Sequence, residues 1–203
     1  MTVLLSVLGG YLLGSIPFGY IVGRFVSGKD VREGGSGATG ATNIARQLGL
    51  KWAIPVAILD IAKGALPVVL TISFFDNPVW LPAATGIAAI VGHIFPVWIR
   101  FRGGKGVSTA LGVAIVISPW GTLVALIAFV AAFAVARFVS IGSLAAVVAY
   151  FIAVFVFGAK IDASGLDTKI FAAALPIIVI WTHRSNISRI IKGKELRVKG
   201  QRD

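Results

Sequence analysis

Long apolar runs alternate along the chain with short polar segments. Residues 3–25 carry no charge before Arg24, and this run is long enough to cross a hydrocarbon core, which takes about 20 apolar residues. Residues 52–75 and 80–99 form two more runs, joined by a predicted turn at Asp76, Asn77 and Pro78. Residues 139–157 and 170–181 form the last two. The pattern predicts an all-α protein, a polytopic bundle of transmembrane helices.

Residues 107–136 decide the number of crossings. This run is too long for one comfortable span, and its centre has the chemistry of a turn, since proline cannot continue a helical hydrogen-bond ladder. The residues at that centre are Ser118, Pro119, Trp120 and Gly121. Splitting the run there leaves a first piece of about 18 Å, which has to cross as a thin or tilted helix within the bundle. We therefore expect seven spans, with five as the alternative.

The composition agrees with a membrane protein. Hydrophobic residues make up 57% of the chain and charged residues 13%, whereas soluble domains carry about a quarter charged residues. High hydrophobicity excludes a disordered chain. The absence of cysteine excludes a disulfide scaffold, thiol redox chemistry and cysteine-ligated metals.

The net charge of +11 is concentrated in three segments, residues 24–51, 100–105 and 184–203, which hold 15 of the 19 Lys and Arg residues. Short basic segments between apolar runs are placed in the cytoplasm by the positive-inside rule. This predicts an outer N-terminus, a cytoplasmic C-terminus and an inner-membrane protein. The first helix lacks the basic segment of a cleaved signal peptide, so we expect it to be retained. Nucleic acid is not an expected partner.

The predicted outer loop contains Lys160, Asp162, Asp167 and Lys169 and is charge-neutral, as the positive-inside rule expects of a loop outside the cytoplasm.

The first polar loop, residues 34–46, is rich in glycine and hydroxyl side chains and contains Asn43 and Arg46. Consecutive backbone N–H groups of glycine-rich segments converge on anions, and arginine binds phosphate through two parallel hydrogen bonds. The loop is therefore interpreted as a phosphate cradle. The alternative is a flexible linker, which has no need of Asn43 or Arg46.

The second loop, residues 92–109, contains His93, two adjacent glycines and Lys105 before a predicted helix near Val107. Glycines and a lysine at a helix N-terminus form an anion site. The spacing is not that of a Walker motif, because Gly106 stands where serine or threonine is required, so ATP hydrolysis is not expected.

The third segment, residues 183–195, places His183 and Asn186 on one helical face at the membrane boundary. Its basic residues also suit an amphipathic tail on anionic lipid, and both roles are compatible.

Asp60 and Lys63 lie inside the second span, where ionisable residues mark function by default, although the pair could also be purely structural. Two histidines without clustered carboxylates predict no metal site.

The three loops, in this order, resemble the bacterial acyl-phosphate-dependent glycerol-3-phosphate acyltransferase family. The similarity covers nearly the whole chain and extends to positions in the first two spans: Gly14, Ser15, Ile16, Pro17, Gly19, Asp60, Lys63 and Gly64. It implies transfer of an acyl chain from acyl phosphate to the 1-hydroxyl of glycerol 3-phosphate. Lysophosphatidate and phosphate are then the products, and neither coenzyme A nor another cofactor takes part.

The resemblance also implies roles for single residues. The catalytic ones are Ser36, Arg46, His183 and Asn186, and Glu195 has a structural role. The expected substrate-binding residues are Gly35, Gly37, Gly40, Thr42, Asn43, Asp60, Lys63, His93, Gly103, Gly104, Lys105, Gly106, Ser108 and Thr109. The family usually has asparagine where this chain has Ala38, so one hydrogen bond of the relatives is absent or replaced.

The chemistry of the residues fits this reaction. Acyl phosphate is already activated, so catalysis needs mainly charge neutralisation and positioning. The hydroxyl proton is accepted either by His183 as general base or, as we favour, by the donor's own phosphate. Ser36 is expected to donate hydrogen bonds rather than act as a nucleophile, because no activating base lies near it in sequence. We expect a single monomeric domain, residues 1–203, in contact with membrane lipid.

Two other classes of protein remain as alternatives. A transporter for a phosphorylated solute would also carry basic glycine-rich loops, but transporters place their sites near the membrane midplane and often contain inverted repeats. A peripheral scaffold bound to anionic lipid would explain the basic tail and leave both glycine loops without a function.

Overall fold

The computed structural model describes residues 2–74, 78–158, 160 and 165–198, and these residues form helices and connecting turns without a strand. The predicted turn residues Asp76 and Asn77 and the predicted outer-loop residue Asp162 lie outside the described part of the chain. In chain order the helices are α1 (Thr2–Gly14), α2 (Phe18–Ser27), η1 (Val31–Glu33), α3 (Ala41–Leu48), α4 (Leu50–Phe74), α5 (Leu81–Ile94), η2 (Val97–Ile99), α6 (Val107–Ile117), α7 (Pro119–Ala136), α8 (Val139–Phe157), α9 (Leu166–Thr182) and α10 (Arg184–Ile191). The all-α prediction is confirmed.

The predicted turn within residues 107–136 is present. Helix α6 ends at Ile117, and α7 begins at Pro119 in the first helical position, where proline loses no helical hydrogen bond. Ser118 caps α7, since its Oγ accepts a hydrogen bond from Gly121 N at 3.2 Å. Proline geometry and a side-chain cap thus reverse the chain in the middle of a continuous apolar run.

Five described segments are long and apolar enough to cross a membrane, namely Thr2–Ser27, Leu50–Phe74, Leu81–Ile99, Pro119–Ala136 and Val139–Phe157. Helices α9 and α10, which meet at a bend of 58°, make a sixth if they count as one span. Helix α6 is apolar but has only 11 residues. This is an integral membrane protein with five or six candidate spans among its described residues, and the seventh crossing and the orientation stay predictions.

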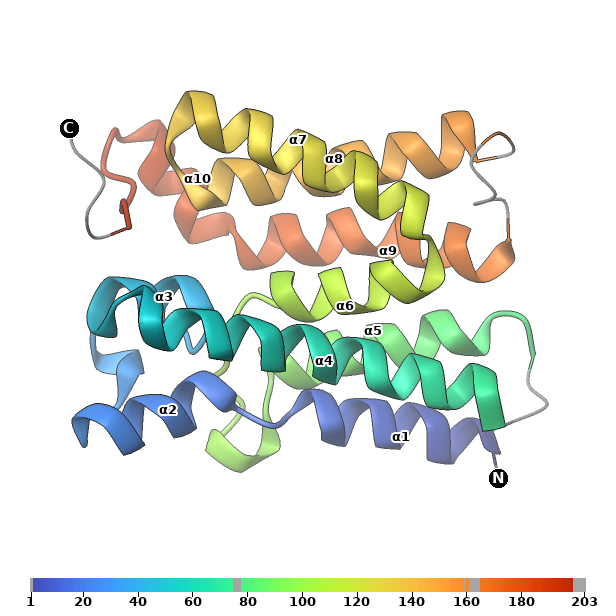
Figure 1. Ribbon diagram of the computed structural model, residues 1–203, viewed down its shortest axis with the longest axis horizontal. Helices are drawn as coiled ribbons and strands as arrows, with labels where there is room; N and C mark the ends of the chain where they lie inside the picture. The colour runs from blue at the N-terminus through green and yellow to red at the C-terminus, as the bar shows by residue number, and fades with distance from the viewer. Residues whose placement is uncertain (1, 75–77, 159, 161–164, 199–203) are drawn as a thin grey trace.

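Most helices run along the long axis of the molecule (Figure 1). Helix α1 packs against α5 and α4, α4 packs against α6, and α8 packs against both α7 and α9. Helices α2, α3 and α10 gather at one end of the bundle, opposite the end at which α1 begins (Figure 1). The three polar segments singled out in the sequence are thereby collected at one end of the bundle.

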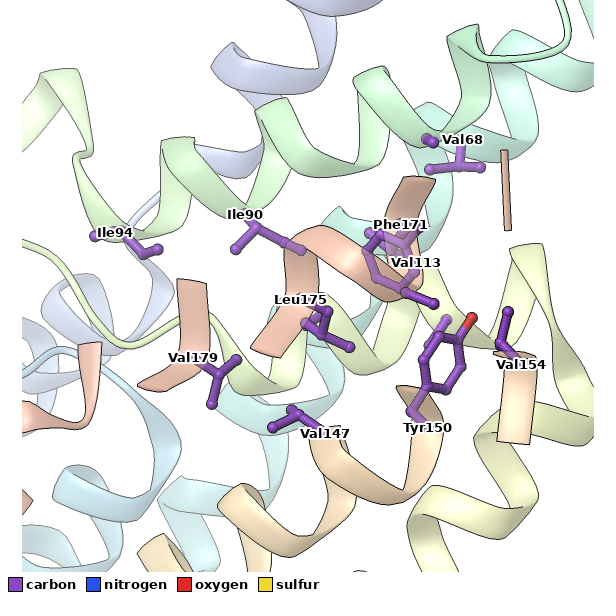
Figure 2. Packing of buried hydrophobic residues seen from close by; sticks show 14 residues of the cluster. Val68, Ile90, Ile94, Val113, Val147, Tyr150, Val154, Phe171, Leu175 and Val179 are labelled. Carbon is purple, nitrogen blue, oxygen red and sulfur yellow. The ribbon is translucent and has the colours of Figure 1, made fainter. Parts of the chain in front are cut away.

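The largest group of buried hydrophobic residues lies where α5, α6, α8 and α9 meet. Figure 2 shows its side chains, among them Val113 of α6, Tyr150 of α8 and Phe171 of α9. A smaller cluster around Ile44 and Val56 joins α3 to α4. The first cluster fills the bundle, and the second fixes the amphipathic helix α3 at its polar end.

The first span is interrupted between Gly14 and Phe18, where Pro17 lacks the N–H that a continuous helix requires. Lys63 of α4 reaches this interruption, and its Nζ donates to the Ile16 carbonyl at 2.7 Å. The same Nζ lies 2.8 Å from Asp60 Oδ1, and His93 Nδ1 of α5 lies 3.6 Å from that oxygen. Because irregular backbone inside a membrane needs internal partners, this buried group stabilises the break.

Helices α1 and α5 approach each other at Gly14. A Cβ atom built there would lie 2.1 Å from the Ala89 carbonyl oxygen, so only glycine allows the two backbones to come this close. Close approach through small residues is the usual way in which membrane helices pack. Gly9, in the same helix, has no atom within 4 Å of the corresponding position.

We therefore expect Gly14→Ala to lower the free energy of unfolding by about 1–3 kcal/mol, the usual cost of overpacking. Gly9→Ala is the matched control, and it should be neutral or stabilising, because alanine favours a helix over glycine by about 1 kcal/mol. Reversible unfolding in detergent micelles measures both variants. Equal effects of the two substitutions would contradict the proposed close contact.

Candidate active site

A cavity of about 330 Å³ opens at the end of the bundle that holds α3 and α10. Its polar lining comes from all three of the loops singled out in the sequence: Ser36, Thr42, Asn43, Arg46, His93, Lys105, Ser108, His183 and Asn186. Farther along the helices its lining is mostly apolar: Ala110, Leu111, Ala114, Thr122, Ala125, Leu126, Phe129, Val139, Ala146, Val147, Tyr150, Leu175 and Val179. One cavity thus joins a polar mouth to an apolar arm.

The first loop is held in shape by Asn43 at the start of α3. Its Nδ2 donates to the carbonyls of Val31, Gly34 and Ala38 at 2.9, 3.2 and 2.7 Å, and its Oδ1 accepts from Ser36 N at 2.9 Å. The side chain is buried, so these bonds form away from competing water. Asn43 therefore sets the loop conformation, a role distinct from the substrate contact predicted for it.

Arg46 lies one helical turn beyond Asn43 and faces the cavity. Its Nε donates to the Arg197 carbonyl at 3.2 Å and one terminal nitrogen donates to the Leu196 carbonyl at 2.8 Å. Burial lowers the pKa of Arg46, but arginine keeps its charge in proteins. The backbone following α10 thus orients a permanent cation at the mouth.

The second loop packs its glycines against His93. The Gly104 N–H donates to the His93 carbonyl at 3.1 Å, and a Cβ at Gly104 would lie 2.1 Å from His93 Nε2. Thr39 N donates to the Gly103 carbonyl at 3.4 Å, which joins the first loop to the second. Close packing on the ring explains why this segment is rich in glycine.

Lys105 extends from this loop toward the third segment. Its Nζ donates to Asn186 Oδ1, and its backbone carbonyl accepts from Thr182 Oγ1 at 3.2 Å. Burial lowers the pKa of Lys105 to about 8, and the nearby Arg189 acts in the same direction. The ammonium group is therefore cationic at neutral pH and loses its charge within the mildly alkaline range.

His183 lies at the bend between α9 and α10, where its buried ring lines the cavity. Its Nδ1 is 2.8 Å from the Val179 carbonyl oxygen. A carbonyl oxygen only accepts, so we assign the proton of the neutral ring to Nδ1, which leaves Nε2 as the acceptor. The local geometry thus selects the tautomer that a general base or an orienting acceptor would use.

Asn186 and Glu195 complete the third segment. Asn186 Nδ2 donates to Glu195 Oε1 at 2.5 Å, Ser140 Oγ donates to the same oxygen at 2.9 Å, and Arg189 Nε donates to Oε2 at 2.9 Å. Burial raises the pKa of Glu195, but these three hydrogen bonds outweigh it and hold the pKa below the usual value. The carboxylate thus orients Asn186 toward Lys105.

The structure brings most of the predicted site residues together. All four residues expected to be catalytic line the cavity, as do seven of the expected substrate-binding residues: Gly40, Thr42, Asn43, His93, Lys105, Gly106 and Ser108. The other seven are not in its lining: Gly35, Gly37, Asp60, Lys63, Gly103, Gly104 and Thr109. Asp60 and Lys63 instead form the buried group at the break in the first span.

Some lining residues had no motif to mark them in the sequence. Ser140 and Ser143 of α8 and Thr122 of α7 are isolated hydroxyl residues in apolar helices. The spacing of Ser140 and Ser143 on one helical face, directly after Arg137, was the only available signal. Hydroxyl residues are common in membrane helices, so this signal alone could not separate them from ordinary packing positions.

The cavity suits an amphiphile with an anionic head. Arg46 and Lys105 supply two cations at the mouth, and Ser36, Thr42 and Ser108 add hydroxyl groups there. The apolar arm supplies a surface for a hydrocarbon chain, whose transfer from water is favourable at about 25 cal/mol per Å² of buried area. The arrangement can therefore hold charged groups beside the polar end of a long apolar chain.

The chain is similar to known acyltransferases over almost its whole length. The family model described as glycerol-3-phosphate acyltransferase matches residues 4–193. The glycerol-3-phosphate acyltransferase of Myxococcus xanthus is 46% identical over 191 residues, covering 94% of this chain and 97% of that protein. The Aquifex aeolicus enzyme of the same description is 38% identical, and the match covers 97% of this chain and 100% of that protein.

Solved structures show the same fold. The crystal structure of PlsY, an integral membrane glycerol 3-phosphate acyltransferase, in its glycerol 3-phosphate form matches with a TM-score of 0.88 and 37% identity, covering 97% of this chain and 96% of that one. The lysophosphatidic acid form of PlsY matches with a TM-score of 0.84 and 36% identity, covering 97% and 95%.

Proposed function

This chain belongs to the glycerol-3-phosphate acyltransferase family, and we propose that it transfers the acyl chain of a fatty acyl phosphate to the 1-hydroxyl of glycerol 3-phosphate. The products are lysophosphatidate and inorganic phosphate, and the reaction is the first step of phospholipid synthesis. The observation that carries the proposal is the single cavity in which the basic mouth continues into the apolar arm. Both substrates carry phosphate, and one of them also carries a long chain.

At the acyl carbon the reaction forms one bond and breaks one, and the hydroxyl proton passes to the leaving phosphate. The 1-hydroxyl oxygen of glycerol 3-phosphate attacks the acyl carbonyl carbon, and the bond from that carbon to the phosphate oxygen breaks. Negative charge develops on the carbonyl oxygen and on the leaving phosphate, and preorganised cations stabilise such charge in a site that excludes water. We assign this role to Arg46 and Lys105, which are held in place by the Leu196 carbonyl and by Asn186.

Ser36 is assigned to orientation and not to covalent catalysis. Its backbone N–H is engaged by Asn43, and among the described residues its hydroxyl has no hydrogen bond to His183, the base that a nucleophilic serine would need. The donor is already activated, so direct transfer does not need an acyl-enzyme intermediate. Trapping a stable acyl adduct on Ser36 would overturn this assignment.

The proposed arrangement in the membrane follows the basic loops. The cavity mouth, with α10 beside it, faces the cytoplasm of a bacterial inner membrane, and the chain crosses the membrane seven times as a monomer. Helix α1 begins at one end of the bundle and α10 lies at the other, which supports an odd number of crossings (Figure 1). A short α6 shielded by α4, α5, α7 and α9 suits a crossing that is not exposed to the full bilayer thickness.

The proposed function predicts that purified protein given palmitoyl phosphate and glycerol 3-phosphate forms lysophosphatidate and releases phosphate in equal amounts. Arg46→Ala and Lys105→Ala should each lower kcat/KM by at least about 100-fold, because removing one donor to a developing oxyanion typically costs this much. Lys192→Ala is the matched control. Lys192 is an exposed cation at the end of α10 that does not line the cavity, so its removal should leave activity unchanged.

Donors are compared in the same assay. Activity with acyl phosphate and none with acyl coenzyme A or acyl carrier protein supports the proposed donor, and the reverse result refutes it. Folded protein without turnover on any donor would refute the enzyme assignment and favour a transporter of phosphorylated solutes.

The lowered pKa of Lys105 predicts an alkaline limit for substrate capture. The second pKa of the phosphate of glycerol 3-phosphate is about 6, so this group stays doubly charged above neutrality. A change of charge at alkaline pH therefore comes from the protein and not from this substrate. Cationic Lys105 predominates below its pKa of about 8 and is lost above it. We expect kcat/KM to fall as the pH rises through this value, by about tenfold per pH unit at the steepest.

Lys105→Arg provides the control for this pH dependence, because arginine keeps its charge throughout the range. The alkaline limb should move to higher pH in the variant even if its maximal activity is lower. An alkaline limb at the same pH in both proteins would show that another group titrates.

The leaving phosphate is proposed to accept the hydroxyl proton, while His183 orients the substrates. Under this mechanism His183→Gln, which keeps a hydrogen-bonding side chain, should lower kcat by less than about 100-fold. A loss of about 100-fold is the smallest that we expect when a general base is removed. Single-turnover rates together with binding of each substrate measure the effect. A loss of kcat beyond this size in both His183→Gln and His183→Ala, with binding intact, would make His183 the base.

A further inference from the structure

The apolar arm of the cavity follows one face of α8. The lining residues Val139, Ser140, Ser143, Ala146, Val147 and Tyr150 recur every three or four positions, as one helical face does. From Val139 to Tyr150 this face rises by about 16 Å at 1.5 Å per residue. Half of a bilayer hydrocarbon core is about 15 Å thick, so the arm is about as long as one ordinary membrane acyl chain.

Tyr150 lies at the end of the arm that is farthest from the mouth. Val139 and Ser140 begin α8 close to the mouth, where Ser140 contacts Glu195, and Tyr150 lies three turns deeper. Helix α7 runs in the opposite direction, so that Thr122 near its start is deep. Helix α9 ends at the mouth, which places Leu175 deeper than Val179.

The Tyr150 ring is fixed by its surroundings. It is 1% exposed, and the Phe171 ring packs edge-on against it with 5.8 Å between centroids and 85° between planes. A Cβ at Gly121 would lie 3.1 Å from the ring, so the start of α7 passes directly beside it. In Figure 2 the ring lies among Val113, Val154 and Phe171, which belong to the close-packed core. A ring held in this way cannot swing aside for a longer chain.

From this geometry we infer that Tyr150 is the stop that sets the longest acyl chain the cavity accepts. This inference rests on the proposed function and adds to it the determinant of chain length. Chains that end before the ring bury all their methylene groups in the arm. Longer chains have to displace the ring or leave the arm, and a single methylene in an apolar site is worth about tenfold or more in kcat/KM.

Two substitutions test the stop in opposite directions, with a series of lauroyl, myristoyl, palmitoyl, stearoyl and arachidoyl phosphates. Ala146→Leu fills the arm one turn before Tyr150 and should lower kcat/KM for stearoyl relative to lauroyl phosphate by about tenfold or more. Tyr150→Val removes the ring, so it should raise the kcat/KM for arachidoyl phosphate relative to that for palmitoyl phosphate by about tenfold.

Matched controls separate the stop from general effects on the fold. Tyr150→Phe keeps the ring, so the wild-type length profile should remain. Ala145→Leu adds the same volume as Ala146→Leu at the neighbouring position of α8, which does not line the cavity, and it should also leave the profile unchanged. If Tyr150→Val fails to fold, Ala146→Leu and its control still decide the question.

A second measurement separates this inference from the proposed reaction. Thermal stabilisation of each variant by lysophosphatidates of the same chain lengths reports the depth of the arm without turnover. A stabilisation profile that shifts to shorter chains in Ala146→Leu supports the stop even if acyl phosphate proves not to be the donor. Unchanged length profiles in Ala146→Leu and Tyr150→Val, by turnover and by stabilisation, would overturn it while leaving the acyltransferase assignment in place.

Discussion

The structure depends on one buried cation. Lys63 Nζ contacts the Asp60 carboxylate and the Ile16 carbonyl, so it joins α4 to the break in the first span, and Asp60 in turn faces His93 of α5. Removing either charge would leave the other unpaired in a low-dielectric interior, which typically costs about 3–5 kcal/mol. His93 also supports the glycines that precede Lys105. An ion pair outside the cavity lining thereby helps to position the second loop through His93.

Each of the other two loops has a buried asparagine as its organiser. Asn43 satisfies three carbonyls and one N–H of the first loop, and Asn186 connects Lys105 to Glu195. Such fully bonded polar groups are rigid because every alternative arrangement would leave a buried donor or acceptor unpaired. The cations at the mouth are therefore positioned before any substrate arrives, which lowers the reorganisation that the reaction requires.

Sequence patterns predicted the parts of this protein that depend on local chemistry. The apolar runs marked the helices, Pro119 with Ser118 marked the turn between α6 and α7, and the clustered basic residues indicated that the three loops share one end. Features that depend on which helical faces meet were not predictable in this way. In the sequence, Asp60 and Lys63 fitted a substrate-binding pair and a structural pair equally well. The apolar arm consists of alanine, valine and leucine positions that resemble those of any membrane helix.

The hydrogen bonds of Arg46 have a consequence for the biogenesis of the protein. Arg46 donates to the carbonyls of Leu196 and Arg197, about 150 positions later in the chain. Chains are synthesised and begin to fold from the N-terminus, so the first loop is made long before the backbone that orients its arginine. Asn186 and Glu195 also belong to this late segment. The cation cluster can therefore be completed only after the last segment of the chain has been made.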